Sequence, residues 1–264
     1  MNVPPILCYH KVDTRLELGV TRLGPSLFRR QVATLAALGF RSLGTADLRA
    51  HVTGGAHADG TAPTVALTFD DGYAGLERHA FPVLVAHGMR ALVFVITDYV
   101  GRDNAWDVRI GGRAFAHLDW EALGRWQERG IEVHVHGASH GRLTWMSDAE
   151  VSDDLGRARE AIRQRLGAAP AAVAYPFGAV DDRVRRLAAE AGFTLGFAGP
   201  VGGTEDLLRL PRLSVYPWDR AGVPYVMQAG ALGALARAGG RLTNRVSIGT
   251  ALIQKVMGTR YRRG

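Results

Sequence analysis

The chain has 264 residues, of which 47% are hydrophobic, and a formal net charge of +7 at neutral pH. This length is sufficient to bury a full core, and it fits one α/β domain without help from disulfides. The single cysteine, Cys8, excludes an internal disulfide and a cysteine-based zinc finger. We therefore expect a metal site to be built from histidine and carboxylate ligands.

The basic surplus is almost entirely arginine, since Lys11 and Lys255 are the two lysines. It favours a phosphate, anionic lipid or acidic glycan partner, or it reflects a general compositional preference for arginine. We do not expect nucleic-acid binding, because the basic residues are not interleaved with aromatics on one face. With no signal-peptide pattern and no apolar run of roughly 20 residues, we expect a cytoplasmic protein, or one that is peripheral on the inner membrane.

Short apolar strands and amphipathic helices are predicted to alternate along the chain. The predicted strands cover residues 6–10, 40–43, 64–69, 91–97, 131–136, 172–177, 193–198 and 210–216. The predicted helices cover residues 26–38, 73–87, 120–129, 147–166 and 180–191, with a short helix from residue 45. Ser26 is expected to cap the first helix, and Pro82 to kink or divide the helix over 73–87.

This alternation predicts an α/β fold, either a (β/α) barrel or a closely related wound sheet. Residues 1–218 form the predicted barrel domain. Residues 219–264 form a basic C-terminal tail that is expected to be helical. The tail either contacts an anionic membrane surface or ends the chain as a solvated helix.

The strand over residues 64–69 ends abruptly at Asp70, Asp71 and Gly72. Neighbouring residues at a strand end point in different directions, so one carboxylate can hold a metal while the other handles protons. The alternative is a polar turn that caps the next helix. In a barrel, the carboxyl ends of the strands face one rim, where we expect the aspartates to meet His10, His136 and Phe177.

His136 and His140 lie four residues apart, directly after a predicted strand. If this segment turns helically, both imidazoles share one face and bind one cation together with Asp71. Two histidines and one carboxylate leave positions open for water and substrate, which is typical of a catalytic metal. Zinc suits this set best, and cobalt, nickel or iron also fit. His134 is expected to face the opposite side of the strand, as a core or surface residue.

Three motifs in order resemble the polysaccharide deacetylase family, which is carbohydrate esterase family 4 or the NodB-homology group. They are TFDDG (68–72), HGASH (136–140) and AYPFG (174–178), and the resemblance covers roughly residues 4–216. It implies a deformed (β/α) barrel and metal-dependent removal of an N-acetyl group from an amino sugar.

By position in these motifs, the resemblance also assigns roles to single residues. It implies that Asp71, His136 and His140 hold the metal. It implies that Asp70 is the general base and that the backbone N–H of Phe177 stabilises the oxyanion.

Three features depart from the family pattern. Gly137 lacks the hydroxyl that usually follows the first histidine of the second motif, so support for the metal ligands must come from elsewhere. Ala174 replaces the arginine that usually pairs with the base, and Arg212 is either its replacement or a surface arginine. The late histidine that usually supplies the general acid is absent, since no histidine follows His140.

The opening LCYH (7–10) resembles the branch related to poly-N-acetylglucosamine deacetylases, in which the barrel is circularly permuted. This implies that His10 is the general acid; the alternative is a buried structural histidine. Trp120, in LDW (118–120), resembles the groove tryptophan of the family, although such an aromatic is more often core. We expect Trp120, together with Tyr9 and Pro176, to contact substrate.

The expected function is therefore metal-dependent de-N-acetylation of a glycan or a glycan precursor in cell-surface polysaccharide synthesis. The expected partner is a glycan or a lipid-linked glycan. One alternative is a deformylase or amidase that acts on a lipid-linked sugar or a small amide, because the same water attack serves any carbonyl that fits. The other alternative is a catalytically inactive carbohydrate-binding relative.

Overall fold

The computed structural model describes residues 3–15, 21–54, 62–105, 114–200, 206–217 and 219, and the structural statements below concern these residues. The predicted tail over 219–264 lies outside them, apart from Asp219. No described helix is both long enough and apolar enough to span a membrane.

The secondary structure follows the predicted alternation, with shorter strands. The strands are β1 (Ile6–Tyr9), β2 (Lys11–Val12), β3 (Arg22–Leu23), β4 (Arg41–Ser42), β5 (Thr64–Phe69), β6 (Ala91–Val95), β7 (Ile131–Val135), β8 (Ala172–Ala174), β9 (Leu195–Ala198), β10 (Leu210–Pro211) and β11 (Leu213–Ser214). The helices are α1 (Pro25–Ala37), α2 (Thr45–Val52), α3 (Gly75–His79), α4 (Phe81–Ala86), α5 (Trp120–Gln127), α6 (Asp148–Leu166) and α7 (Asp182–Glu190). Short 3-10 turns are η1 (Thr97–Tyr99), η2 (Leu143–Trp145) and η3 (Pro176–Gly178).

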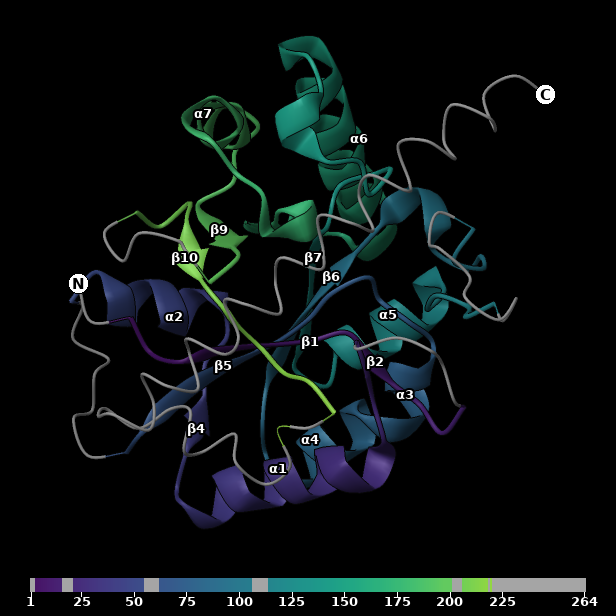
Figure 1. Ribbon diagram of the computed structural model, residues 1–264, viewed down its shortest axis with the longest axis vertical. Helices are drawn as coiled ribbons and strands as arrows, with labels where there is room; N and C mark the ends of the chain where they lie inside the picture. Colours follow the sequence, from purple (N-terminus) through teal and green to yellow (C-terminus); the bar gives the residue numbers. More distant parts are fainter. Residues whose placement is uncertain are drawn as a thin grey trace.

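The main sheet has nine strands, and every pairing in it is parallel. Its order is β10-β9-β8-β7-β6-β5-β1-β11, and β4 pairs with the start of β5. Because β10 and β11 are separated by Arg212 alone, residues 210–214 pair with β9 on one side and with β1 on the other. This segment joins the two edges of the sheet, so the deformed (β/α) barrel is confirmed, with helices around the strands (Figure 1).

Alternate residues of the strands fill the inside of the barrel. An apolar cluster there includes Ile6, Ala66, Leu92, Phe94 and Phe197, and α2 contributes to it. Residues two positions further along a strand share the same face. Further along the strands, toward their carboxyl ends, the face that carries Ile6 and Ala66 therefore carries polar residues.

His134 corrects one expectation, because it shares a face with His136 instead of opposing it. Residues two apart on a strand point the same way, and His134 lies one layer below His136, tilted against Phe94 at 5.8 Å. Its Nε2 donates to Glu132, whose carboxylate also accepts from the backbone N–H of Thr45 at the start of α2. Glu132, which His134 contacts, therefore links the start of α2 to the barrel.

Two helix ends test the capping predictions. Pro82 lies where the helix divides, and α3 and α4 meet at Ala80, as expected. The expectation for Ser26 is wrong, because α1 begins one residue earlier, with Pro25 in its first turn and Gly24 as the N-cap. Proline is preorganised for the first helical position, which explains the earlier start.

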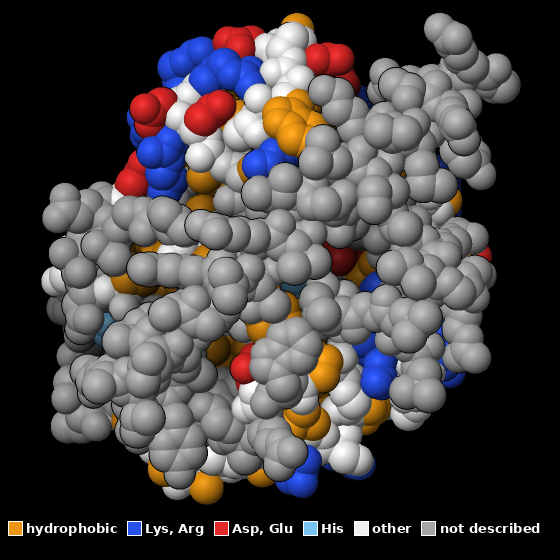
Figure 2. Space-filling view, viewed as in Figure 1, with side chains coloured by type: hydrophobic (Ala, Val, Ile, Leu, Met, Phe, Trp, Pro, Cys, Tyr) orange, Lys and Arg blue, Asp and Glu red, His pale blue; other side chains and the backbone are white. Residues whose placement is uncertain are grey.

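Charged side chains of both signs are mixed over α6 and α7 (Figure 2). Asp148 pairs with Arg183 at 2.9 Å and with Arg186 at 3.1 Å, and Arg186 also pairs with Glu190. Arginines in this region are therefore largely neutralised by neighbouring carboxylates.

Candidate active site

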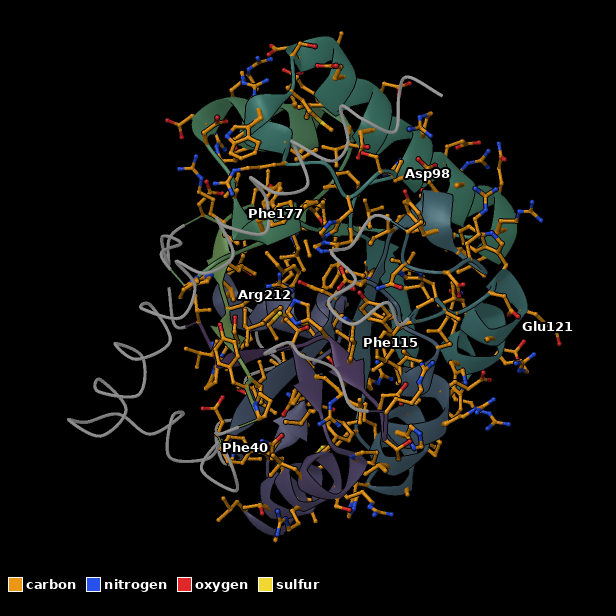
Figure 3. The ribbon with its side chains drawn as sticks, turned by 45° about the vertical axis from the view of Figure 1, so that its right-hand side comes forward. Phe40, Asp98, Phe115, Glu121, Phe177 and Arg212 are labelled. Carbon is orange, nitrogen blue, oxygen red and sulfur yellow. The ribbon has the colours of Figure 1, made fainter. Side chains whose placement is uncertain are left out.

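The predicted site residues, which follow several different strands, lie at the carboxyl end of the barrel. His10 follows β1, Asp70 and Asp71 follow β5, His136 follows β7, Phe177 follows β8, and Arg212 lies between β10 and β11. Figure 3 shows Arg212 and Phe177 near the middle of the molecule, while Glu121 of α5 lies at its edge. The barrel thus brings together residues that are up to 202 positions apart in the sequence, from His10 to Arg212.

Asp71, His136 and His140 form a compact set of metal-ligand side chains. Oδ1 of Asp71 lies 3.5 Å from Nε2 of His136 and 3.5 Å from Nε2 of His140. One ligand atom from each residue lies within 4.8 Å of the others, and all three residues are buried. The carboxylate and the two imidazoles can therefore coordinate one divalent ion and leave further positions open.

The protonation states of His136 and His140 also suit metal binding. His136 donates from Nδ1 to the backbone carbonyl of Ala174 at 2.8 Å, which leaves Nε2 as the acceptor that faces Asp71. Burial lowers the pKa of both His136 and His140, so both rings are neutral at neutral pH. Ala174 cannot supply the side chain of the usual arginine, yet its carbonyl fixes the tautomer of a ligand.

The loop between the two histidines is held by Asp154, a buried residue of α6. Its carboxylate accepts from the backbone N–H groups of Ala138 at 2.8 Å and Ser139 at 3.0 Å, and from the Ser139 hydroxyl at 2.6 Å. A Cβ on Gly137 would lie 2.7 Å from the carboxylate of Asp154. Gly137 therefore makes room for the group that replaces the missing hydroxyl. Sequence reasoning missed Asp154, although it lies within the apolar stripe of α6.

Backbone strain is concentrated at this site. Among the described residues, the three non-glycine residues with positive φ are Asp71 at 68°, His140 at 59° and Phe177 at 61°. His140 therefore does not reach Asp71 through a helical turn, which corrects the expected conformation of residues 136–140. Such left-handed residues are costly and cluster at functional sites.

Arg212 forms an ion pair with Asp70, the aspartate outside the set of metal-ligand side chains. Its Nη1 and Nη2 each donate to one oxygen of Asp70 at 2.7 Å, and Nη1 also lies 3.3 Å from the Thr68 hydroxyl. Burial alone would raise the pKa of Asp70, but the guanidinium outweighs that effect and holds the pKa below its ordinary range. Arg212 is 4% exposed, so it is not a surface arginine.

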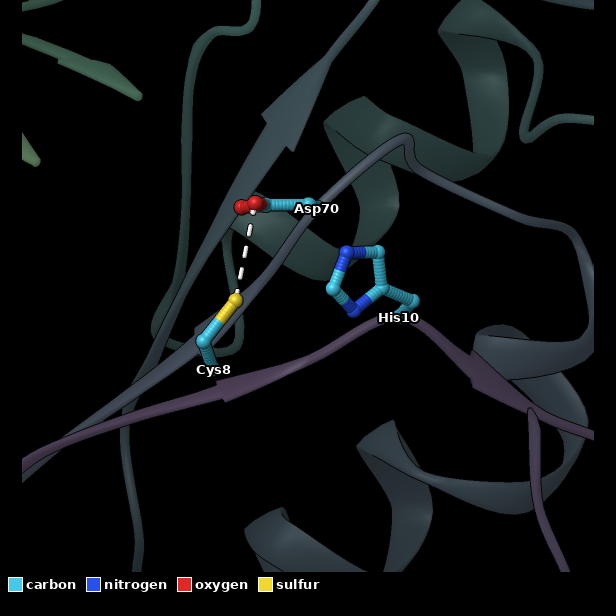
Figure 4. Close-up of side chains that lie close together, drawn as sticks. All are labelled: Cys8, His10 and Asp70. Carbon is cyan, nitrogen blue, oxygen red and sulfur yellow. Dashed lines mark hydrogen bonds between the residues drawn. The ribbon is translucent and has the colours of Figure 1, made fainter. Parts of the chain in front are cut away.

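Asp70 also belongs to a second cluster, with Cys8 and His10 (Figure 4). The Cys8 thiol donates to Oδ2 of Asp70 at 3.5 Å. Burial lowers the pKa of His10 to about 4, and the nearby Asp70 carboxylate offsets only part of that effect. Sequence reasoning gave Cys8 no role, although strand alternation places it on the same face as His10.

The expected substrate contacts lie in different surroundings. Trp120 is half-buried and lines a cavity of about 490 Å³ together with Asp98, whose backbone N–H donates to Ala138 in the metal-ligand loop. Pro176 is buried beside Phe177. Tyr9 is 1% exposed and stacks on Phe69, so its side chain belongs to the core. Substrate contact by Trp120, Pro176 and Tyr9 stays a prediction. The burial of the Tyr9 side chain in the core does not support such a contact for that residue.

Comparisons with known proteins show the family of this chain. The family model for polysaccharide deacetylase matches residues 57–196, which is more than half of the chain. A putative polysaccharide deacetylase, YxkH of Bacillus subtilis, is 22% identical over 216 residues, covering 81% of this chain and 71% of that protein.

Two further comparisons are with a relative whose activity is named and with a solved structure of the same fold. The poly-beta-1,6-N-acetyl-D-glucosamine N-deacetylase of Staphylococcus aureus is 23% identical over 141 residues; the match covers 51% of this chain and 47% of that enzyme. The Streptococcus pyogenes deacetylase PplD, solved in complex with acetate, superposes with a TM-score of 0.74 at 22% identity. That superposition covers 86% of this chain and 98% of PplD, and it shows the same fold. From the family match, the chain belongs to the polysaccharide deacetylase family.

Proposed function

We propose that this protein is a metal-dependent de-N-acetylase that acts on amino-sugar units of a glycan or a glycan precursor. One juxtaposition carries this function. Asp71, His136 and His140 present their ligand atoms within 4.8 Å of one another, and Asp70 stands beside them without belonging to the set. Oδ2 of Asp70 lies 3.8 Å from Nε2 of His136. A carboxylate next to a metal set can accept a proton from water bound there.

The reaction is hydrolysis of an amide. A divalent ion at Asp71, His136 and His140 would polarise the amide carbonyl and acidify a water molecule. Asp70 accepts the proton of the attacking water, and Arg212 keeps the Asp70 carboxylate ionised and oriented for that step. The backbone N–H of Phe177 is the donor proposed for the oxygen that gains negative charge. The C–N bond then breaks, and the amine leaves with a proton.

His10 is the proposed donor of that last proton. With a pKa of about 4, it is neutral at neutral pH and must first receive the proton that it donates. Asp70 lies next to it in the same cluster. The proton removed from water can therefore pass from Asp70 to His10 and on to the amine nitrogen, which returns both groups to their starting states.

The substrate class extends this proposal. The S. aureus relatives are named for poly-beta-1,6-N-acetyl-D-glucosamine, which supports an N-acetylglucosamine-type glycan, free or lipid-linked, in cell-surface polysaccharide synthesis. Zinc is the proposed ion, because two imidazoles and one carboxylate are its common ligands. The cytoplasmic or inner-membrane location and the membrane contact of the basic tail stay predictions.

Acetate release from N-acetylglucosamine oligomers tests the function. The protein loaded with one equivalent of Zn²⁺ should release acetate, and Asp70→Asn should lower kcat by at least about a hundredfold, because the base is lost. Asp13→Asn is the matched control: Asp13 is a buried carboxylate paired with an arginine, Arg15, outside the site. This control should keep the wild-type rate and the metal content.

The other outcomes identify the alternatives. A wild type that binds zinc and releases formate, or cleaves only small amides, would replace deacetylation with the deformylase or amidase function. A wild type that binds glycan and is as inactive as Asp70→Asn on every amide would be a carbohydrate-binding relative. Either result would overturn the proposal.

His10→Ala tests the proton donor. We expect a loss of about a hundredfold in kcat with little change in zinc content, because His10 is not a ligand of the proposed zinc. His134→Ala removes a different barrel histidine, which is buried one layer below His136, and should retain the wild-type kcat once folded. Equal rates for His10→Ala and the wild type would show that the amine takes its proton from elsewhere.

Asp154→Asn tests the support of the metal-ligand loop. The amide places an N–H₂ group against donors of residues 138–139, so zinc affinity should fall about 10–100-fold, as measured by calorimetry. Asp153→Asn, at the neighbouring exposed position on α6, is the control and should bind zinc as tightly as the wild type. Unchanged zinc affinity in Asp154→Asn would show that Asp154 does not support the metal-ligand loop.

A further inference from the structure

Cys8, His10 and Asp70 have a geometry of their own, distinct from the set formed by Asp71 and the two later histidines. One ligand atom from each of the three lies within 4.8 Å of the others. The Cys8 thiol points at Oδ2 of Asp70 across 3.5 Å (Figure 4). Cys8 and Asp70 are each 3% exposed, while His10 is half-buried.

The donor chemistry of this cluster favours thiophilic divalent ions. A thiolate sulfur, an imidazole nitrogen and a carboxylate oxygen are each ligands that Zn²⁺ accepts, and Cd²⁺ binds sulfur still more readily. Binding is balanced by one proton: the S–H bond of Cys8 breaks, a sulfur–metal bond forms, and the proton leaves to solvent. Three protein ligands leave at least one position for water.

Two features lower the metal affinity of this cluster relative to the set of Asp71, His136 and His140. The Arg212 guanidinium already donates to both oxygens of Asp70, and its positive charge opposes a cation there. The thiol must also give up its proton, which burial makes harder by raising the pKa of Cys8. An ion should therefore fill the set of Asp71, His136 and His140 first and reach Cys8 only when it is in excess.

We propose that Cys8, His10 and Asp70 form a second, weaker site for Zn²⁺ or Cd²⁺, and that its occupation inhibits the enzyme. The two sites adjoin at His136, whose Nε2 is 3.5 Å from Asp71 and 3.8 Å from Asp70. An ion held by Asp70 and His10 removes the base and the proton donor together. The inhibition rests on the proposed deacetylase function, whereas the binding does not.

Cadmium titration of the metal-free full chain, followed by ultraviolet absorption, tests the binding. Because Cys8 is the single cysteine, any thiolate-to-cadmium charge-transfer band must come from it. The first equivalent should add no band, and the band should grow with the second equivalent. Cys8→Ser should bind the first equivalent as the wild type does and show no band. A wild type without a band at tenfold excess, or with a full band at the first equivalent, would overturn the proposal.

Acetate release at one and at ten equivalents of Zn²⁺ tests the inhibition. The wild type should lose at least about fivefold of its rate in excess zinc, while Cys8→Ser, compared with its own rate at one equivalent, should lose less than twofold. Equal inhibition of both proteins would overturn the inhibitory role. If the wild type is inactive at one equivalent, the proposed function fails, and the cadmium titration still decides whether the second site exists.

Discussion

Two hydrogen bonds of 2.7 Å join the Arg212 guanidinium to both oxygens of Asp70, deep inside the barrel. The side chains of this pair are 5% and 4% exposed, so each charge depends on the other for compensation. Arg212 belongs to the segment that joins the two edges of the sheet, and Asp70 directly follows β5, which pairs with the other side of β1. The same contact therefore couples barrel closure to the orientation of Asp70, the proposed general base.

The interior of the barrel is graded from apolar to polar. Ile6, Ala66 and Phe94 fill the lower layers, where the charge of Glu132 is compensated by hydrogen bonds from His134 and Thr45. Two residues further along their strands, the same faces carry Cys8 and Thr68, and Arg212 lies over the Phe94 ring at 5.8 Å. A low-dielectric floor under the polar rim strengthens every electrostatic contact above it. This explains how one arginine can keep a fully buried carboxylate ionised.

Much of this arrangement was predictable from local pattern. Continuous apolar runs indicated parallel strands covered on both faces, and the carboxylates and histidines at their ends indicated a common rim. The metal-ligand set was predicted from two histidines four residues apart after one strand, from an aspartate after another strand, and from the family resemblance. The position of Trp120 at a cavity was suggested by its motif, and its contact with substrate is still a prediction.

The remaining features depend on contacts between distant segments. The bond between Arg212 and Asp70 spans 142 residues; it was one of the two alternatives for Arg212, and no periodicity in the sequence chooses between them. Asp154 supports the metal-ligand loop from a helix 15 to 16 residues away, through backbone groups that a residue pattern does not reveal. The expected helical turn at His140 failed because glycine and a left-handed histidine allow a tighter loop. The error at His134 came from the wrong parity along a strand, not from missing information.

A double-mutant cycle on the free energy of unfolding tests the central role of the pair most directly. Denaturant unfolding of the metal-free protein would compare Arg212→Met in the wild type and in Asp70→Asn. In the wild type the substitution leaves a buried carboxylate uncompensated and should cost about 3 kcal/mol or more. In Asp70→Asn, where no charge is left behind, it should cost markedly less. Equal costs in both backgrounds would show that the two residues are not coupled, and would contradict this account of the barrel and its base.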